Sequence, residues 1–185
     1  MKPIHLRNVP PPLETFDHIS FLENIASWIK PERYLELGVR SGSSFVRISG
    51  HCKEAWGVDL VEPNFQVPDN GKIYIESTDS FFRGLEPDVL FDMVFIDADH
   101  SHEQSLKDFL NVKDRVIYDG FVFLHDTYPY DEGMTIPTLS DKAYKTALWI
   151  KSNLIKDWEC VTLPFNPGLT ILKRMDQNKQ LLWER

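Results

Sequence analysis

Cysteine is nearly absent from this sequence, which contains only Cys52 and Cys160. Two cysteines are too few for a disulfide framework, so we expect a reducing compartment and place the protein in the cytoplasm. Long apolar runs are missing too. Nowhere do about eighteen apolar residues follow one another, and the opening segment MKPIHLRNVPPPLE lacks the apolar core of a signal peptide. We therefore expect no membrane partner.

Basic residues are outnumbered, with 20 Lys and Arg against 28 Asp and Glu and a formal net charge of −8. Affinity for a phosphate backbone comes largely from clustered basic side chains, so this balance argues against a nucleic-acid partner. The remaining composition, 42% hydrophobic and 26% charged, is typical of a folded globular protein. A chain of 185 residues is long enough for one domain with a full core.

Proline gathers near the N-terminus, at Pro3 and at positions 10–12. Because proline is excluded from helix interiors, residues 1–17 are expected to form an extended arm. Residues 18–175 then form a single domain, and residues 176–185 form a tail. The apolar residues of that tail could pack on the domain or on a second subunit, so a homodimer is one expectation.

Apolar periodicity predicts a helix over 18–30, followed by alternating strands and helices. Regular alternation of this kind predicts an α/β fold, a Rossmann-like doubly wound, mostly parallel seven-stranded sheet with helices on both faces. The expected strands begin at Arg33 and otherwise span 54–60, 72–76, 91–96, 120–124, 158–163 and 169–172, and the last helix spans 140–155.

In such sheets, ligands bind beyond the carboxyl ends of the strands. Those ends should bring together Glu36 with the turn from Gly38 to Gly42, Asp59, and the segments 77–79, 97–100 and 125–127. This acidic set suits a ligand that offers hydroxyl groups and carries a positive charge.

The glycine turn reads Glu36-Leu37-Gly38-Val39-Arg40-Ser41-Gly42. A dinucleotide fingerprint needs glycine where Arg40 stands, so NAD and FAD are disfavoured. Asp59 ends the second strand, at a spacing from Gly38 that suits an acid accepting from ribose hydroxyls. The pair suggests a ribose without a pyrophosphate.

Five motifs, LELGVRSGSS, GVDL, STDSFF, FIDADHSHEQ and GFVFLHDT, occur in order at the expected strand ends. In these motifs the sequence resembles the class I S-adenosylmethionine (SAM)-dependent methyltransferases over about residues 18–174. It is most similar to the small-molecule O-methyltransferases, some of which bind a divalent metal. The resemblance implies that the last two strands form an antiparallel pair.

The resemblance also implies the cofactor contacts. Gly38 and Gly42 would admit the methionine part of SAM, and Glu36 would orient the turn or the amino group. Asp59 would accept from the ribose, although a purely structural role is its alternative, and for Asp79 the alternative is a turn or helix cap. The complete expected set is Glu36, Gly38, Gly42, Ser43, Asp59, Leu60, Thr78, Asp79, Ser80 and Asp97, with residues 78–80 along the adenine edge.

The chemistry is expected at Asp97, His100, His125 and Asp126. An alcohol does not ionise unaided near neutral pH, so either a histidine removes its proton or a metal acidifies it. His100 is the first candidate base, with a backbone-bonded loop histidine as its alternative. For His125, a buried role and a site role are both open.

The metal-dependent relatives use an Asp after the fourth strand and an Asp-Asn or Asp-Asp pair after the fifth. Asp97 and Asp126 match this pattern, and Thr127 occupies the third ligand position without matching it. His100, Asp99 or water could complete a site for Mg²⁺ or another divalent cation.

We therefore expect SAM-dependent methyl transfer to a hydroxyl of a small molecule such as a sugar, a phenol or a secondary metabolite. Two other classes stay open. One is a non-catalytic SAM-binding or interaction domain, and the other is a nicotinamide-dependent oxidoreductase.

Overall fold

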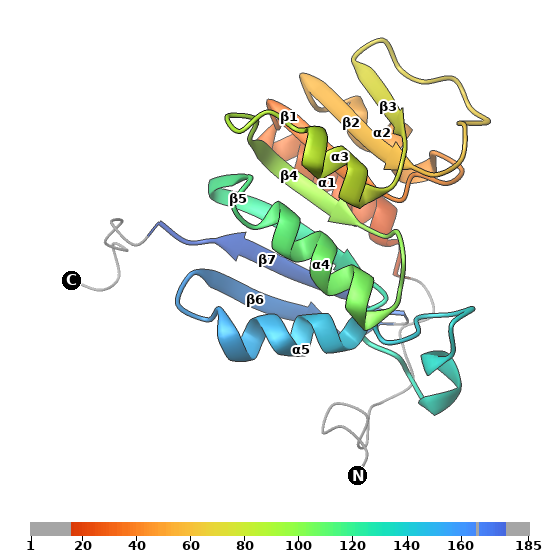
Figure 1. Ribbon diagram of the computed structural model, residues 1–185, viewed down its shortest axis with the longest axis vertical. Helices are drawn as coiled ribbons and strands as arrows, with labels where there is room; N and C mark the ends of the chain where they lie inside the picture. Colours follow the sequence, from red (N-terminus) through yellow and green to blue (C-terminus); the bar gives the residue numbers. More distant parts are fainter. Residues whose placement is uncertain (1–15, 166, 177–185) are drawn as a thin grey trace.

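The computed structural model describes residues 16–165 and 167–176 (Figure 1). The expected arm at 1–17 and tail at 176–185 lie almost wholly outside the described residues, which include only Phe16, Asp17 and Asp176 of these segments. Among the helices of the described ranges, none is long and apolar enough to cross a membrane.

Helices and strands alternate as expected. The helices are α1 (His18–Ile29), α2 (Ser43–Ser49), α3 (Thr78–Gly84), α4 (His102–Val112), α5 (Ala143–Asn153) and the 3-10 turn η2 (Glu132–Thr135). The strands are β1 (Arg33–Leu37), β2 (Glu54–Asp59), β3 (Gly71–Ile75), β4 (Phe91–Ile96), β5 (Val116–His125), β6 (Trp158–Leu163) and β7 (Leu169–Arg174).

The seven strands form one sheet in the order β3-β2-β1-β4-β5-β7-β6. Strands β1 to β5 pair in parallel, whereas β7 is antiparallel to both β5 and β6. This confirms the predicted mostly parallel sheet with its antiparallel last pair. The strand order reverses between β1 and β4, which is where ligands bind in sheets of this kind.

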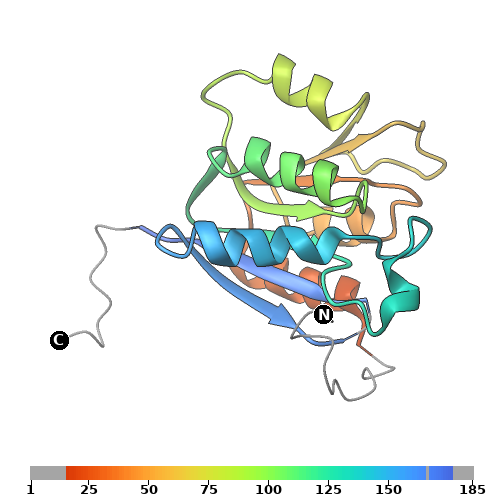
Figure 2. The ribbon, with the colours of Figure 1, turned by 60° about the horizontal axis from the view of Figure 1, so that its bottom comes forward.

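Helices cover both faces of the sheet, with α3, α4 and α5 on one side and α1 and α2 on the other (Figures 1 and 2). Alternate side chains of β1 enter the two cores because successive strand residues point to opposite faces. Leu35 and Leu37 join the core that contains Phe109 of α4, and Tyr34 joins the core that contains Leu22 of α1.

The sequence prediction missed one helix and misplaced the start of two other elements by three or four residues. Residues 78–84 form helix α3, which was not expected, because Ser77 caps the amide of Ser80 and Phe81 packs into the core. Strand β5 begins four residues earlier than expected, at Val116. Helix α5 begins only at Ala143 and ends at Asn153, because Asp141 adopts φ +40°, outside the helical region, and residues 140–142 form a turn.

Candidate functional site

A cavity of about 820 Å³ opens at the carboxyl ends of β1, β2, β4 and β5. Most of the residues expected at the site line it: Gly38, Ser43, Asp59, Leu60, Thr78, Asp79, Asp97, His100, His125 and Asp126. Four other expected residues, Glu36, Gly42, Ser80 and Thr127, are not among the lining residues. The strand ends therefore converge as the sequence predicted, although these four residues do not line the cavity.

The glycine turn approaches the end of β4 closely. Gly38 has φ +86°, and a Cβ there would lie 2.3 Å from the carbonyl oxygen of Asp97. Gly42 has φ +75° and faces the ring of Phe65, so its backbone shapes the start of α2 instead of lining the cavity. Arg40 is exposed with φ +50°, and its side chain stands where a dinucleotide site needs a bare backbone.

Asp59 holds the glycine turn from the neighbouring strand end. Its Oδ2 accepts from the amides of Val39 at 2.9 Å and Arg40 at 2.8 Å, and its Oδ1 accepts from the amide of Val61 at 3.0 Å. Each carboxylate oxygen can accept about two hydrogen bonds, so Oδ1 retains capacity for a ligand hydroxyl. Asp59 therefore has a structural role in holding the turn, and this role is compatible with accepting a hydrogen bond from a ribose hydroxyl.

Glu36 is fully buried beneath the turn. Its carboxyl accepts from the hydroxyls of Tyr34 and Ser44, both at 2.5 Å. Burial raises the pKa of Glu36 to about 8, and these two hydrogen bonds act in the opposite direction without outweighing it. The expected role of Glu36 in orienting the turn fits this geometry because Ser44 belongs to the first turn of α2. Direct contact with a ligand amino group does not fit a side chain without exposure.

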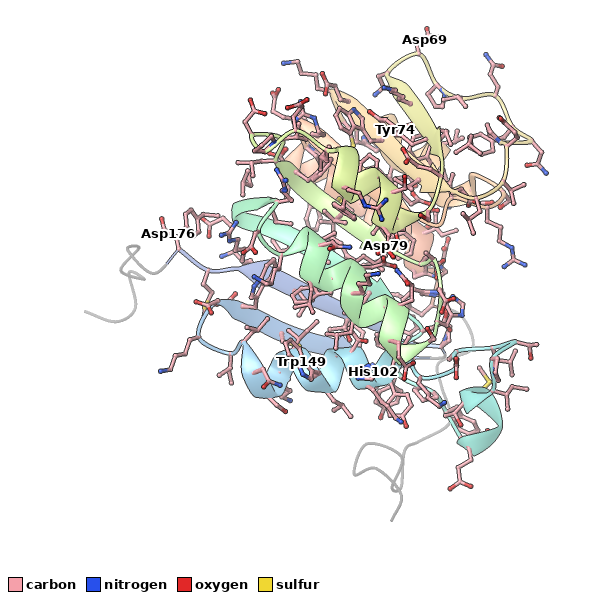
Figure 3. The ribbon with its side chains drawn as sticks, viewed as in Figure 1. Asp69, Tyr74, Asp79, His102, Trp149 and Asp176 are labelled. Carbon is pink, nitrogen blue, oxygen red and sulfur yellow. The ribbon has the colours of Figure 1, made fainter. Side chains whose placement is uncertain are left out.

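The segment after β3 contributes Thr78 and Asp79 to the cavity. Asp79 forms an ion pair with Lys107 of α4, and the hydrogen bond from that ammonium lowers the pKa of Asp79. Figure 3 shows Asp79 between α3 and α4. The amide of Ser80 donates to the capping hydroxyl of Ser77, which places Ser80 inside the helix cap. We therefore drop Ser80 from the expected adenine edge.

Four polar side chains meet where β4 and β5 end. Asp97 Oδ1 lies 2.9 Å from His125 Nδ1 and 3.5 Å from His100 Nε2. Asp126 Oδ2 lies 3.2 Å from both His125 Nδ1 and His100 Nε2, and Asp126 Oδ1 accepts from Ser140 at 2.7 Å. Two carboxylates and two imidazoles thus form one connected cluster on the cavity wall.

The charges in this cluster support one another. Burial acts to raise the pKa of Asp97, but hydrogen bonds from His100 and His125 outweigh it and hold that pKa well below the usual range. The hydrogen bond to Asp97 raises the pKa of His100 to about 9. For His125, burial acts downward, yet bonds to Asp126 and Asp97 raise its pKa to about 10.

The Nδ1 atom of His100 lies 2.7 Å from the carbonyl oxygen of Leu139. A carbonyl only accepts, so Nδ1 carries the hydrogen and Nε2 faces the carboxylates. Both nitrogens are therefore occupied, and His100 is less suited to act as a base than the sequence suggested. Ligand atoms of Asp97, His100 and Asp126 all lie within 4.8 Å of one another, a grouping that could hold a metal ion.

Thr127 points away from that grouping. Its buried hydroxyl accepts from Thr170 at 2.8 Å, and the same hydroxyl lies 3.5 Å from the carbonyl oxygen of Leu124. We therefore replace Thr127 by His100 in the candidate ligand set. Asp99, the other acid considered, is exposed and accepts from the amide of Ser101 in a local turn.

The lining residues that the sequence reasoning missed include His18, Gln104 and Asp108. Gln104 and Asp108 lie four residues apart on one face of α4, and Gln104 donates to Asp108 and to Thr78. That spacing was a usable signal. His18 opens α1, and nothing local in the sequence indicates that the start of α1 reaches the strand ends.

Comparison with known proteins agrees with this arrangement. The profile of a family described as "Methyltransferase domain" matches residues 35–127, just over half of the chain. That range runs from β1 to the end of β5 and contains the glycine turn, Asp59 and the Asp97–Asp126 cluster. No curated protein matches the sequence.

Several solved structures share the fold. PaMTH1, a methyltransferase from Podospora anserina solved with SAH, is 18% identical, with a TM-score of 0.65 over 86% of this chain and 78% of that one. TomG, an O-methyltransferase from Streptomyces achromogenes solved with SAM, is 15% identical, with a TM-score of 0.66 over 88% and 82%. An O-methyltransferase from Bacillus cereus in complex with SAH is 12% identical, with a TM-score of 0.64 over 90% and 84%.

At these low identities the structural likeness shows only a shared fold. The family match also shows which family the sequence belongs to. Because that match spans half of the sequence and coincides with the strands that build the cavity, the chain belongs to the methyltransferase-domain family.

Proposed function

We infer that this protein uses SAM to methylate a hydroxyl group of a small molecule. The observation that carries this proposal is a single cavity that joins two sets of residues. One set is the glycine turn with Asp59, which suits the polar parts of the cofactor. The other is the Asp97–His100–Asp126 cluster, which suits an acceptor hydroxyl. The solved neighbours that bind SAM or SAH support the same cofactor.

The residues present fit SAM. A glycine at position 38 leaves backbone open where a side chain could not stand, and Asp59 Oδ1 can still accept from a hydroxyl. Bound SAM would supply an electrophilic methyl group on a sulfonium.

The same cluster fits a divalent cation. Asp97 Oδ1, Asp126 Oδ2 and His100 Nε2 provide two oxygens and one nitrogen, and the carbonyl of Leu139 fixes the ring of His100 through Nδ1. Histidine metal ligands usually donate their other ring N–H to such a partner. A cation held there would acidify a bound hydroxyl.

The cofactor assignment is tested by melting the purified protein with S-adenosylhomocysteine. A ligand at about 100 times its dissociation constant stabilises a protein by about 2.7 kcal/mol, which corresponds to a rise in Tm of about 5–10 °C at this size. NAD should cause no shift, and Asp59→Ala should lose the shift. Absence of a shift at millimolar S-adenosylhomocysteine would contradict the proposal, and a shift with NAD would favour the oxidoreductase.

The reaction is tested with SAM labelled in the methyl group and a panel of sugars, catechols and simple phenols. We expect label in at least one acceptor, and we expect Asp126→Ala and His100→Ala to reduce its transfer. Activity within twofold of wild type in both variants would remove the cluster from the mechanism. Cofactor binding without transfer to any acceptor would favour the non-catalytic alternative.

The acceptor class rests on the cavity, whose volume of about 820 Å³ lies in the range of small-molecule sites. The net charge of −8 disfavours nucleic acid as the substrate. A homodimer remains a prediction, because the apolar tail that suggested it lies outside the described residues. Light scattering at several protein concentrations tests it.

A further inference from the structure

His18 lies at the cavity wall beside the cluster of Asp97, His100, His125 and Asp126, although it comes from the N-terminal part of the sequence. It is the first residue of α1 and lines the cavity together with His125 and Asp126. The ring centroids of His18 and His125 are 4.2 Å apart, and Phe95 lies beyond at 6.2 Å. The wall near the acceptor therefore carries three imidazoles, not two.

The other two imidazoles offer no accessible lone pair. His100 donates through Nδ1 to Leu139, and its Nε2 is directed at Asp126 and Asp97. His125 Nδ1 lies between the same two carboxylates, and its Nε2 is buried without a partner among the described residues. A general base needs a free nitrogen within reach of the acceptor proton. Hydrogen bonding at both nitrogens excludes His100 from that role, and burial of the remaining nitrogen excludes His125.

His18 also lines the cavity, but it differs from His100 and His125 because neither of its ring nitrogens is occupied by a hydrogen bond within the part of the chain that the structure describes. Within residues 16–165 and 167–176, its ring makes ring contacts but no hydrogen bond. Burial lowers the pKa of His18, and the neighbouring His125 lowers it further, while Asp97, Asp17 and Asp126 act in the opposite direction. These are the charged groups of α1 and of the β4 and β5 ends that face the ring. The net effect is a pKa for His18 below the ordinary value of 6.5, the direction that favours the neutral imidazole.

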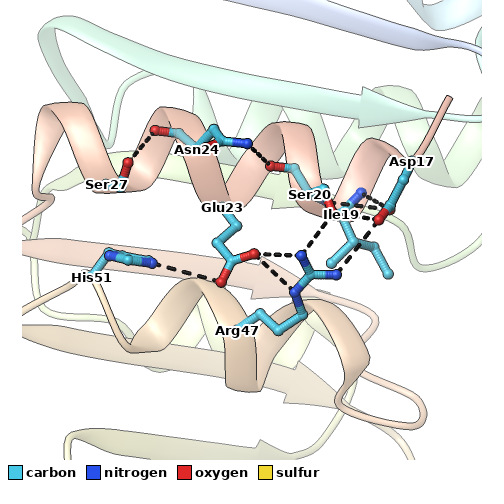
Figure 4. A network of polar contacts seen from close by, with 8 residues as sticks. All are labelled: Asp17, Ile19, Ser20, Glu23, Asn24, Ser27, Arg47 and His51. Atoms are coloured by element: carbon cyan, nitrogen blue, oxygen red, sulfur yellow. Dashed lines mark hydrogen bonds and ion pairs between the residues drawn. The ribbon is translucent and has the colours of Figure 1, made fainter.

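The position of His18 is fixed by a set of contacts between α1 and α2, shown in Figure 4. Arg47 of α2 pairs with Glu23, donates to Ser20 Oγ at 2.7 Å and lies 3.6 Å from Asp17, the cap of α1. Because α2 begins at the glycine turn, this contact set ties the start of α1 to the cofactor side of the cavity. Because His18 follows Asp17 directly, the same contacts hold His18 at the cavity wall.

We propose that His18 is the general base that takes the proton from the acceptor hydroxyl, a role that rests on the function proposed above. The O–H bond breaks so that the proton passes to a ring nitrogen of His18 and the electron pair stays on oxygen. That oxygen bonds to the methyl carbon as the carbon–sulfur bond of SAM breaks, and its electron pair goes to sulfur. The imidazolium of His18 then returns its proton to solvent.

The first test needs no acceptor. Diethyl pyrocarbonate modifies accessible neutral imidazoles, and peptide mass mapping assigns each modified histidine. In the full-length protein with S-adenosylhomocysteine at pH 6.5, we expect modification of His18 while His100 and His125 resist. His51 and His102 serve as internal standards. An unmodified His18 after complete modification of both standards would overturn the proposal, as would modification of His100 at the rate of His18.

The second test uses the acceptor that accepts label from SAM. General acid–base catalysis contributes about 10²–10⁴-fold, so His18→Gln should lower kcat by at least about 100-fold while the Kd for S-adenosylhomocysteine stays within twofold. The acidic limb of the kcat–pH profile should disappear in His18→Gln. The matched control is His102→Gln, which changes the first residue of α4 outside the cavity and should keep both kcat and the profile.

These readouts separate the two proposals. Transfer by His18→Gln within threefold of wild type, with an intact acidic limb, would overturn the role of His18 and leave the methyltransferase function standing. If the wild type does not bind S-adenosylhomocysteine, the proposed function is contradicted instead. The modification of His18 can still be measured in that case. If His18→Gln fails to fold, the wild-type modification experiment decides alone.

Discussion

Gly38 and Asp97 touch across the strand switch so closely that no side chain fits between them. A Cβ on Gly38 would lie 2.3 Å from the carbonyl oxygen of Asp97 and 2.6 Å from Ala98 Cα. The contact joins the cofactor turn after β1 to the acidic residue after β4. This close approach, together with the pairing of β1 and β4, sets the distance between the two parts of the cavity.

Gly38→Ala should destabilise the protein and abolish binding of S-adenosylhomocysteine. The clash is with backbone, and φ +86° strains any residue with a side chain, so we expect a loss of at least about 2 kcal/mol. Denaturant melts and isothermal titration measure both effects. The control is Gly84→Ala, where a Cβ meets nothing within 4 Å and should be neutral or stabilising. Wild-type affinity in Gly38→Ala would contradict this account of the turn.

Asp59→Asn should destabilise the protein even without ligand. The carboxylate accepts three backbone amides, and the amide side chain of Asn has only one oxygen to replace them. Loss of a hydrogen bond to a charged group costs about 1.5–3 kcal/mol. Thermal melts of the ligand-free protein measure this loss. The control is Asp69→Asn, which changes an exposed residue at the tip of the β2–β3 connection (Figure 3).

An unchanged melt of ligand-free Asp59→Asn, together with weaker binding of S-adenosylhomocysteine, would mean that Asp59 acts on the ligand alone. Loss of stability together with loss of S-adenosylhomocysteine binding would support two roles for Asp59, one in holding the glycine turn and one in binding the ligand.

Glu36→Gln should change how stability depends on pH. Burial raises the pKa of Glu36 from 4.5 to about 8, so the folded state binds this proton more tightly than the unfolded state does. The stability from this group is complete below pH 4.5 and is lost as the pH rises through 8. As the pH rises from 5 to 9, the stability of Glu36→Gln relative to wild type should therefore increase by about 4 kcal/mol.

The difference between the two proteins isolates Glu36, because His100 and His125 also have raised pKa values and remain in both. Urea melts at pH 5, 7 and 9 measure it. Glu32→Gln, which removes an exposed acid paired with Lys53, is the control. Parallel pH curves for wild type and Glu36→Gln would show that Glu36 ionises normally.

His100→Gln should change which metal ions bind. A site with one imidazole and two carboxylates prefers Mn²⁺, Co²⁺ or Zn²⁺ over Mg²⁺, whereas an all-oxygen site suits Mg²⁺. We expect Mn²⁺ to raise the Tm of wild type more than Mg²⁺ does, and we expect that preference to vanish in His100→Gln. His102→Gln should keep it. Equal and negligible shifts for both ions at millimolar concentration would show that the cluster works without a metal.

The sequence determined the fold and located the strand-end residues that line the cavity. Alternation of apolar strands with helices specifies a mostly parallel sheet, and the carboxyl ends of its strands must share one edge. Gly38, Asp59, Asp97 and Asp126 could therefore be placed from their positions at strand ends. Helix α3 escaped prediction because seven residues hold too little periodicity, and its cap and its packing through Phe81 stabilise it.

Only the tertiary structure decided the orientation of individual side chains and the partners that reach the site from distant elements. Thr127 and His125 are two residues apart, yet Thr127 turns to Thr170 while His125 faces Asp97. Both ring nitrogens of His100 are occupied, Nδ1 by the carbonyl of Leu139 and Nε2 by Asp126. These outcomes depend on long-range packing, which no local pattern encodes. His18 is the clearest case, because the packing of α1 against α2 and the sheet brings it to the cavity wall beside His125.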